Sequence, residues 1–494
     1  MPNFHSNDDH DESPSPHAGH AVVDLLNRCQ ALWSELDRFR EHLKKQRQEQ
    51  SVEISHYRSV VKSELQHLER LSKREQEAVQ QPEDSDNEDR VPKHYIASSN
   101  LPFLEAIWNA TKSSTGLQAL QKRFYYGDVV EKGGIKRGQR SKKGRGQRNV
   151  NVREGKALVD IVTGDGLEWI KVSLVTNHRM LMDKAREGWG DSSDEDSDAS
   201  DDADSGIPLV RMAESLAEAS REVRIRTKHP RIRLLLPKII EGQEPEIDTI
   251  LARLRALGIQ VDCDPNSIVP RSLDSCMDTI LTNQFEGLTE TLNIDCTILL
   301  ALVSDFSHCA VTAEPWFHRA LQRQMEMEDK DNLLPQTIYP AVCGHKMVCS
   351  ADAARRMREI VDTIGTAGER VRTALFLGDE EKCEEQIRSD LQEWSKFEVP
   401  PDLHLPVRVI AQPEDALPPI TNVVRESLTP FNQSVFFLGW STGYTTITSN
   451  RTVVKSIDNL LDVHAKSEDE WPRIWLCPTA RSLVGKEKGR REQN

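Results

Sequence analysis

The segment TLNIDCTILLALVSD, residues 291–305, places one carboxylate, Asp295, between apolar residues. A buried carboxylate without a partner is costly, so such a group is usually hydrogen-bonded, ion-paired or bound to a metal. The residues before it are short and apolar enough for a buried strand, and those after it have the apolar spacing of a helix. Asp295 therefore falls where open parallel sheets bind ligands. The alternative is a helix cap, with the carboxylate accepting the amide hydrogen of Thr297 or Ile298.

A second candidate is the G-x-S-x-G spacing of residues 439–443, which is typical of the nucleophile elbow of α/β-hydrolases. The apolar residues before it predict the strand that an elbow requires. However, the β-branched YTTITSN after it predicts another strand where a helix is needed. The acid would have to be Asp458 or Asp462 and the base His464, which leaves too little intervening chain. The hydrolase interpretation is therefore disfavoured.

A strip of basic residues, interrupted by Gly, Gln and Ser, could follow a phosphate backbone or serve as a nuclear-import signal. A plain solvated loop is an equal alternative. The strip consists of Lys136, Arg137, Arg140, Lys142, Lys143, Arg145 and Arg148. The tract GDSSDEDSDASDDADSG, ending at Gly206, is too acidic to fold and could pair with the strip and mask it.

Composition limits the class of protein. The chain of 494 residues suggests about three domains. Its net charge of −15 argues against binding nucleic acid or anionic membrane over the whole surface, so any nucleic-acid contact must be local. Neither a signal peptide nor a membrane-spanning apolar run is evident, so we expect no membrane partner and an intracellular location, in the cytoplasm, the nucleus or both. Nine cysteines without a CxxC pair indicate buried thiols rather than disulfides or zinc.

The predicted fold class is α/β, with a mainly parallel sheet in the C-terminal half. A mixed α/β region and an N-terminal α-helical hairpin precede it. Helical spacing of apolar residues predicts the hairpin, which could form a coiled coil with a protein partner or, as we favour, pack on its own chain. The predicted organisation is: 1–20 disordered, 21–80 helical hairpin, 81–94 acidic linker, 95–258 mixed α/β domain with disordered basic (about 132–150) and acidic (about 188–206) loops, 259–482 α/β domain, and 483–494 disordered tail.

Two local patterns support the mixed domain. ALVDIVTGDGLEWIKVSL alternates apolar and polar residues about the glycines at 164 and 166, which predicts a β-hairpin. The residues from 221 to 264 predict strand, helix, strand, with Gly258 ending the helix. From there to the C-terminus, predicted strands alternate with predicted helices, as in a parallel sheet.

The segments NIDCTILLALVSD, MVCSADAARRMREIVDTIGTAGERVRTALFL and FFLGWSTGYTTITSNRTVVKSI together resemble the domain-of-unknown-function 1308 family. The resemblance covers residues 259–481. It implies a eukaryotic protein with a PIN-like fold, in which carboxylates at the ends of parallel strands hold Mg²⁺ or Mn²⁺ for cleaving RNA.

The resemblance also implies site residues. Asp295 matches the acid that ends the first strand, and Asp352 or Glu359 would supply a second acid from a central helix. The later strand should end in a T-x-D turn, but here the turn ends in Asn450, and Asp458 lies further along. An amide binds Mg²⁺ more weakly than a carboxylate because it carries no charge.

Two functions follow. The first is an RNA-binding, PIN-like protein that is either a weak metal-dependent ribonuclease or a degenerate domain that binds without cutting. The second is a non-catalytic interaction scaffold, whose N-terminal helices and charged loops recruit a protein partner. Bound Mg²⁺ or Mn²⁺ would separate the two.

Overall fold

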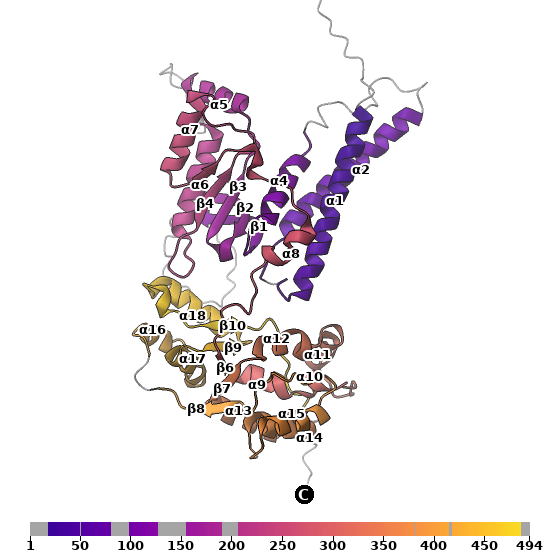
Figure 1. Ribbon diagram of the computed structural model, residues 1–494, viewed down its shortest axis with the longest axis vertical. Coiled ribbons are helices and arrows are strands. Elements are labelled where there is room, and N and C mark those ends of the chain that lie inside the picture. Colours follow the sequence, from indigo (N-terminus) through magenta and orange to yellow (C-terminus); the bar gives the residue numbers. More distant parts are fainter. Residues whose placement is uncertain are drawn as a thin grey trace, which may run out of the picture. The chain divides into compact units, whose positions relative to one another are not determined.

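The computed structural model describes residues 18–49, 51–80, 98–126, 155–189, 206–379, 381–413 and 417–485. The chain divides into two compact units (Figure 1). Unit 1 comprises residues 1–224 and 229–282, and unit 2 comprises residues 225–228 and 283–494. The predicted acidic linker, the basic loop and most of the acidic loop lie outside the described residues, as do residues 1–17 and 486–494.

Unit 1 contains a mixed five-stranded sheet, sheet A, with helices on both faces. Its strands are β1 (Ala119–Tyr126), β2 (Gly155–Thr163), β3 (Glu168–Val172), β4 (Arg231–Leu235) and β5 (Gln260–Asp262). Its helices are α1 (Ala18–Lys45), α2 (Ser55–Gln80), α4 (Leu101–Lys112), α5 (Asn177–Trp189), α6 (Pro208–Glu222), α7 (Pro245–Ala256) and α8 (Leu273–Ile280). The strands follow their sequence order in the sheet; β1–β2 and β2–β3 are antiparallel, and β3–β4 and β4–β5 are parallel.

The local predictions for unit 1 are confirmed. β2 and β3 form the antiparallel hairpin, and the short 3₁₀ turn Gly164–Gly166 joins them. β4, α7 and β5 form the strand, helix and strand, and Gly258 has the left-handed φ of +83° that suits a residue just after a helix. The division between units falls at residue 282, so β5 and α8 lie with the mixed sheet rather than with the C-terminal sheet.

The apolar face of the N-terminal helices is buried inside unit 1. Leu36 and Phe39 of α1 and Tyr57 of α2 are fully buried in one cluster with Trp108 of α4 and Ile161 of β2. Helices α5, α6 and α7 enclose a second core on the other face of sheet A. The helical hairpin therefore packs on its own chain.

Unit 2 is built on an all-parallel sheet, as predicted. Its strands are β6 (Thr291–Ile294), β7 (Lys346–Ser350), β8 (Arg408–Ile410), β9 (Thr445–Thr448) and β10 (Ile474–Leu476), in the spatial order β10-β9-β6-β7-β8. Its helices are α9 (Cys296–Val303), α10 (Asp305–His308), α11 (Arg319–Lys330), α12 (Tyr339–Val342), α13 (Ala351–Ile364), α14 (Ala367–Leu377), α15 (Glu384–Glu393), α16 (Thr421–Arg425), α17 (Pro430–Thr442) and α18 (Arg451–His464).

The strand expected before the G-x-S-x-G motif is wrong, because these residues form helix α17. Thr429 caps α17 by accepting a hydrogen bond from the Asn432 amide at 3.3 Å, and Pro430 occupies the first turn. Gly443 ends the helix with a φ of +69°. The strand predicted after the motif is correct and is β9. A serine inside a helix cannot form a strand-to-helix elbow, so the hydrolase interpretation fails.

Gly439 allows α17 to lie close to the sheet. A Cβ atom at this position would stand 2.0 Å from Oγ1 of Thr446 and 3.1 Å from Nδ2 of Asn293. The Asn293 side chain, buried in β6, donates to the Val435 carbonyl of α17 at 2.9 Å and to Thr446 Oγ1 at 3.0 Å. These polar contacts join α17, β6 and β9.

Among the described residues, no helix is long and apolar enough to cross a membrane.

We predict that Gly439→Ala destabilises unit 2 by about 1–3 kcal/mol, because overpacking against Thr446 outweighs the gain in helix propensity of about 1 kcal/mol. Thermal and denaturant unfolding of the full chain would measure the change. Ser441→Ala is the matched control, since its hydroxyl only donates to the Leu438 carbonyl of its own helix. If Gly439→Ala is as stable as the parent, the close approach of α17 does not constrain the fold.

Candidate functional site

The carboxyl edge of the parallel sheet brings three helix starts together. Asp295 directly follows β6, Ser350 is the last residue of β7, and Asn450 lies two residues after β9; each stands at the N-cap of the next helix. Ser350 Oγ accepts a hydrogen bond from the Ala353 amide at 3.1 Å, and Asn450 Oδ1 accepts one from the Val453 amide at 3.3 Å. Since β6 lies between β9 and β7, Asp295 occupies the central position of this edge.

Asp295 sits at the N-cap position of α9, but its side chain does not form the capping bond. Its carboxylate is 3% exposed and accepts hydrogen bonds on Oδ2 from the hydroxyls of Thr448, at 2.6 Å, and Thr297, at 2.8 Å. These hydroxyls in turn accept from the amides of Asn450, at 3.0 Å, and Ser449, at 3.2 Å. The network joins the end of β6 to the end of β9.

Burial raises the pKa of Asp295, because desolvation disfavours the charged carboxylate. The hydroxyls of Thr448 and Thr297, and after them the amides of Cys296 and Thr297, counteract part of this effect. Burial likewise raises the pKa of the neighbouring Cys296 thiol to about 12, and the Asp295 charge adds to the shift. The centre of this edge therefore favours neutral side chains.

The structure places Asn450 next to Asp295 but distributes the other candidate ligands differently. Asn450 shares Thr448 with Asp295, although its side-chain oxygen is already engaged in capping α18. Asp352, in the first turn of α13, pairs with Arg355 at 2.5 Å. Glu359 is half exposed and pairs with both Arg355 and Arg356.

Asp458 lies in the middle of α18, and burial together with the charge of Asp462 raises its pKa. Across the described ranges, no group of three or more His, Cys, Asp or Glu side chains is arranged to hold a metal ion. Of the predicted ligands, Asp295 and Asn450 are the two that the structure links, through their shared contact with Thr448. Mg²⁺ usually keeps several waters and binds through one or two carboxylates, so this donor set fits it only weakly.

Two clusters outside the carboxyl edge combine residues that are distant in the sequence. Arg372 of α14 is fully buried; it pairs with Asp305 and donates to the carbonyls of Val303 and Trp394, each at 2.9 Å. Arg481 donates to Glu328 at 2.9 Å, and both side chains are almost fully buried. Sequence reasoning missed both clusters, because the residues around a single Arg or Glu do not indicate a partner that is distant in the sequence.

The Arg372 cluster includes two further buried groups that titrate. Glu369 accepts the amides of Asp305, at 3.1 Å, and Val484, at 2.9 Å, and burial raises its pKa. His308 is bonded through Nε2 to the Leu302 carbonyl at 2.7 Å. Burial, with the Arg372 charge, lowers the pKa of His308 to about 3. The imidazole is therefore neutral, with Nε2 as the donor.

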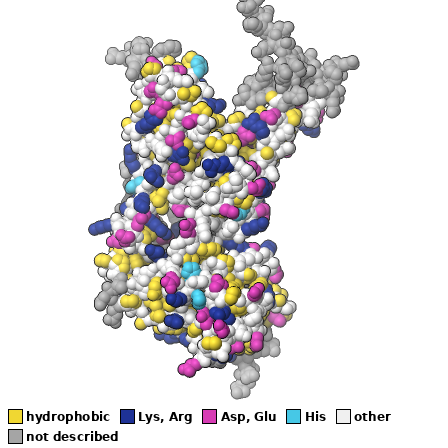
Figure 2. Space-filling view, viewed as in Figure 1, with side chains coloured by type: hydrophobic (Ala, Val, Ile, Leu, Met, Phe, Trp, Pro, Cys, Tyr) yellow, Lys and Arg dark blue, Asp and Glu magenta, His cyan; other side chains and the backbone are white. Residues whose placement is uncertain are grey.

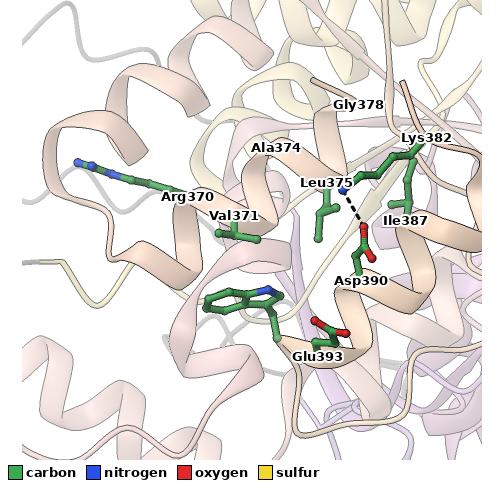
Figure 3. Close-up of a pocket in the computed structure, with 10 residues that line it drawn as sticks. Arg370, Val371, Ala374, Leu375, Gly378, Lys382, Ile387, Asp390 and Glu393 are labelled. Atoms are coloured by element: carbon green, nitrogen blue, oxygen red, sulfur yellow. Dashed lines mark hydrogen bonds and ion pairs between the residues drawn. The ribbon is translucent and has the colours of Figure 1, made fainter. Parts of the chain in front are cut away.

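A pocket of about 450 Å³ lies between α14 and α15, and not at the carboxyl edge (Figure 3). Apolar side chains including Val371, Leu375 and Ile387 form its floor, and the ion pair between Lys382 and Asp390, at 2.8 Å, closes one side. Its lining shares no residue with the Asp295 network. This pocket is therefore separate from the candidate metal ligands around Asp295.

The fold and the site define an α/β unit with an all-parallel sheet and one buried aspartate at the centre of its carboxyl edge. Residues 292–394 match the family described as "Protein of unknown function (DUF1308)", which agrees with the resemblance seen in the sequence over that segment. No curated protein and no solved structure gives a significant match. The matched segment contains Asp295, Asp352 and Glu359 and ends before Asn450 and Asp458.

We predict that two substitutions of Asp295 differ in their effect on the stability of unit 2. Asp295→Asn keeps an acceptor for Thr297 and Thr448 and removes a buried charge, so stability should be unchanged or slightly higher. Asp295→Ala leaves both hydroxyls without their acceptor and should cost about 1–3 kcal/mol. Because burial raises the pKa of Asp295, the parent should lose stability relative to Asp295→Asn as the pH rises from below the ordinary carboxyl range through that raised pKa.

Thermal melts of the parent and both variants across this pH range, with and without millimolar Mn²⁺, would test these effects. Stabilisation of the parent by Mn²⁺ that disappears in Asp295→Asn would establish a metal site. A large loss of stability in Asp295→Asn would instead show that the charge itself is required.

A separate pH effect should come from His308. Since its pKa is lowered to about 3 in the fold, the unfolded chain binds a proton at higher pH than the folded chain does. Stability should therefore fall below about pH 6.5, by up to about 1.4 kcal/mol per pH unit from this group. In His308→Gln, whose amide can donate to the Leu302 carbonyl, melts between pH 7 and 5 should depend less on pH. An identical pH profile in both proteins would contradict this assignment.

Proposed function

We propose that this protein binds RNA, and that the segment between β1 and β2 supplies the positive charge. The supporting observation is where the basic strip enters the fold. Tyr126 and Gly155, which flank that segment, are paired directly in the ladder of sheet A. The 28 residues between them contain nine Lys or Arg and three Asp or Glu, in a chain whose net charge is −15. Such a local excess of cations suits a polyanion.

The charges on the rest of the surface agree with the proposal that RNA contacts the protein mainly at the basic strip. On the face shown in Figure 2, basic and acidic side chains are interspersed over both units. Many of the described cations are paired, such as Arg28 with Glu105 and Arg255 with Glu241. Interspersed charges of both signs do not attract a polyanion strongly. Affinity should therefore come from the strip.

We also propose that unit 2 is PIN-like and binds nucleic acid without cutting it. The order of its parallel strands, the aspartate after β6 and the T-x-N turn after β9 support the PIN-like assignment. Metal-assisted phosphodiester cleavage requires carboxylates that hold cations beside the phosphate. Here one carboxylate is buried with a raised pKa, and Asp352 and Glu359 are paired with arginines. Mg²⁺ or Mn²⁺, if bound, would be held weakly by Asp295 and Asn450.

The competing proposal, a protein scaffold acting through the N-terminal helices, has less support. The apolar faces of α1 and α2 are covered by α4 and sheet A, so they are not free to form a coiled coil with a partner. We place the RNA-binding protein in the cytoplasm or nucleus, where RNA is available.

We predict that replacing the seven basic residues of the strip with Gln weakens RNA binding and its salt dependence. Each phosphate that the variant no longer neutralises should lower the slope of log affinity against log salt by about 0.7 for a single strand. Fluorescence anisotropy with a labelled RNA over a range of salt would measure both. The variant Arg221→Gln, Lys238→Gln removes two exposed cations elsewhere in unit 1 and serves as a control. If the strip variant and the parent bind RNA with equal affinity, the strip does not contribute to RNA binding.

A further inference from the structure

We propose that a surface of unit 1 outside the strip, here called the ribbon face and formed by Arg123, Tyr125 and Lys156, binds single-stranded RNA. One base stacks on the Tyr125 ring, and Arg123 and Lys156 contact the neighbouring phosphates. This inference rests on the proposed function and specifies its ligand, because it requires unpaired bases. It is carried by the register and exposure of these three residues and by the availability of the two cations.

The register of the β1–β2 ladder places the three side chains on one face. Tyr125 pairs directly with Lys156, and residues directly opposite each other in an antiparallel pair share a face. Arg123 lies two residues before Tyr125 and therefore points the same way. The intervening Phe124 points to the other face, where it stacks on Trp169 with ring centroids 4.0 Å apart. That contact fixes which face Tyr125 presents.

The ribbon face is open to solvent. Tyr125 is 64% exposed, one of the two most exposed large hydrophobic side chains in the described part of the chain. Arg123 and Lys156 are exposed, and neither has an ion pair or hydrogen bond with any described residue. The adjacent Lys122, on the opposite face, is instead paired with Glu53 at 3.4 Å and lies over the Phe124 ring. Cations of the ribbon face are thus available, whereas the cation beside them is not.

The chemistry of this face selects a single strand. An exposed aromatic ring on a strand is a rigid platform on which a base can stack, and the energy of stacking depends little on base identity. In a duplex the base faces are covered by their neighbours, so only the phosphates would be accessible to the two cations. Charge complementarity, with two free cations and no described acid paired to them, favours a polyanion over a peptide.

The test uses the full chain and fluorescence anisotropy with a labelled oligouridylate and an RNA duplex of the same length. Tyr125→Ala should weaken binding of the single strand by about tenfold and hardly alter duplex binding, whereas Tyr125→Phe should keep the parent affinity. Arg123→Gln, Lys156→Gln should lower the salt slope by about 0.7 for each phosphate that is no longer neutralised. The matched control, Arg221→Gln, Lys238→Gln, should match the parent in affinity and slope.

The outcomes separate the two proposals. If the parent binds no RNA, the proposed function fails and the ribbon face fails with it. Two results would overturn the proposal for the ribbon face while leaving RNA binding by the strip intact. One is that Tyr125→Ala binds RNA as well as the parent does. The other is that the parent binds the duplex as tightly as the oligouridylate. Thermal melts of each variant would show that loss of binding is not loss of fold, as expected for substitutions of exposed side chains.

Discussion

The desolvated carboxylate of Asp295 is the constraint on which the carboxyl edge of unit 2 depends. Removing this group from water is unfavourable, and two threonine hydroxyls compensate by donating to the same oxygen. Because those hydroxyls also accept amides from the turn after β9, the ends of β6 and β9 are held in one arrangement. Asp295 thus organises the junction of two strand–helix connections.

The topology of the sheet explains why capping side chains gather at the carboxyl edge of unit 2. In an open parallel sheet, strand ends and helix starts converge whatever the chemistry, so N-caps gather there. Ser350 and Asn450 satisfy the first amides of α13 and α18, as N-caps do. The acids nearby in the sequence are directed to arginines. The carboxyl edge therefore carries few unpaired charges, and the dense run of basic residues in the sequence lies between β1 and β2 of unit 1.

Much of the fold could be predicted from the sequence where the pattern was local. The β2–β3 hairpin alternates clearly, and the change from LNI to an apolar helical spacing locates Asp295 between a strand and a helix. Helix α17 was missed because a continuous apolar run does not distinguish strand from helix. Thr429, Pro430 and Gly443 were the signals that could have identified it, since they mark the start and end of a helix. The RNA-binding assignment stays a prediction.

The site was harder to predict because its contacts join distant positions. Spacing indicates that Asp295 and Asn450 approach each other, since both follow parallel strands. It does not show that Thr448 and Thr297 take up the Asp295 carboxylate, because a hydroxyl in a β-branched residue is equally common in a strand without such a role. The partners of Arg372 and Glu328 are also invisible in the sequence, since Arg481 lies 153 residues after Glu328.

The buried polar clusters have a consequence for where unit 2 can be divided. The family-matched segment ends at residue 394, yet inside it Glu369 depends on the amide of Val484 and Glu328 on the guanidinium of Arg481. It also lacks β9, which neighbours β6 in the sheet. A polypeptide that stopped at residue 394 would expose an edge of its central strand, and the buried carboxylates of Glu369 and Glu328 would each lose one of their donors. The family-matched segment is therefore not an autonomous folding unit, and the cooperative unit must extend to the last described residues of unit 2.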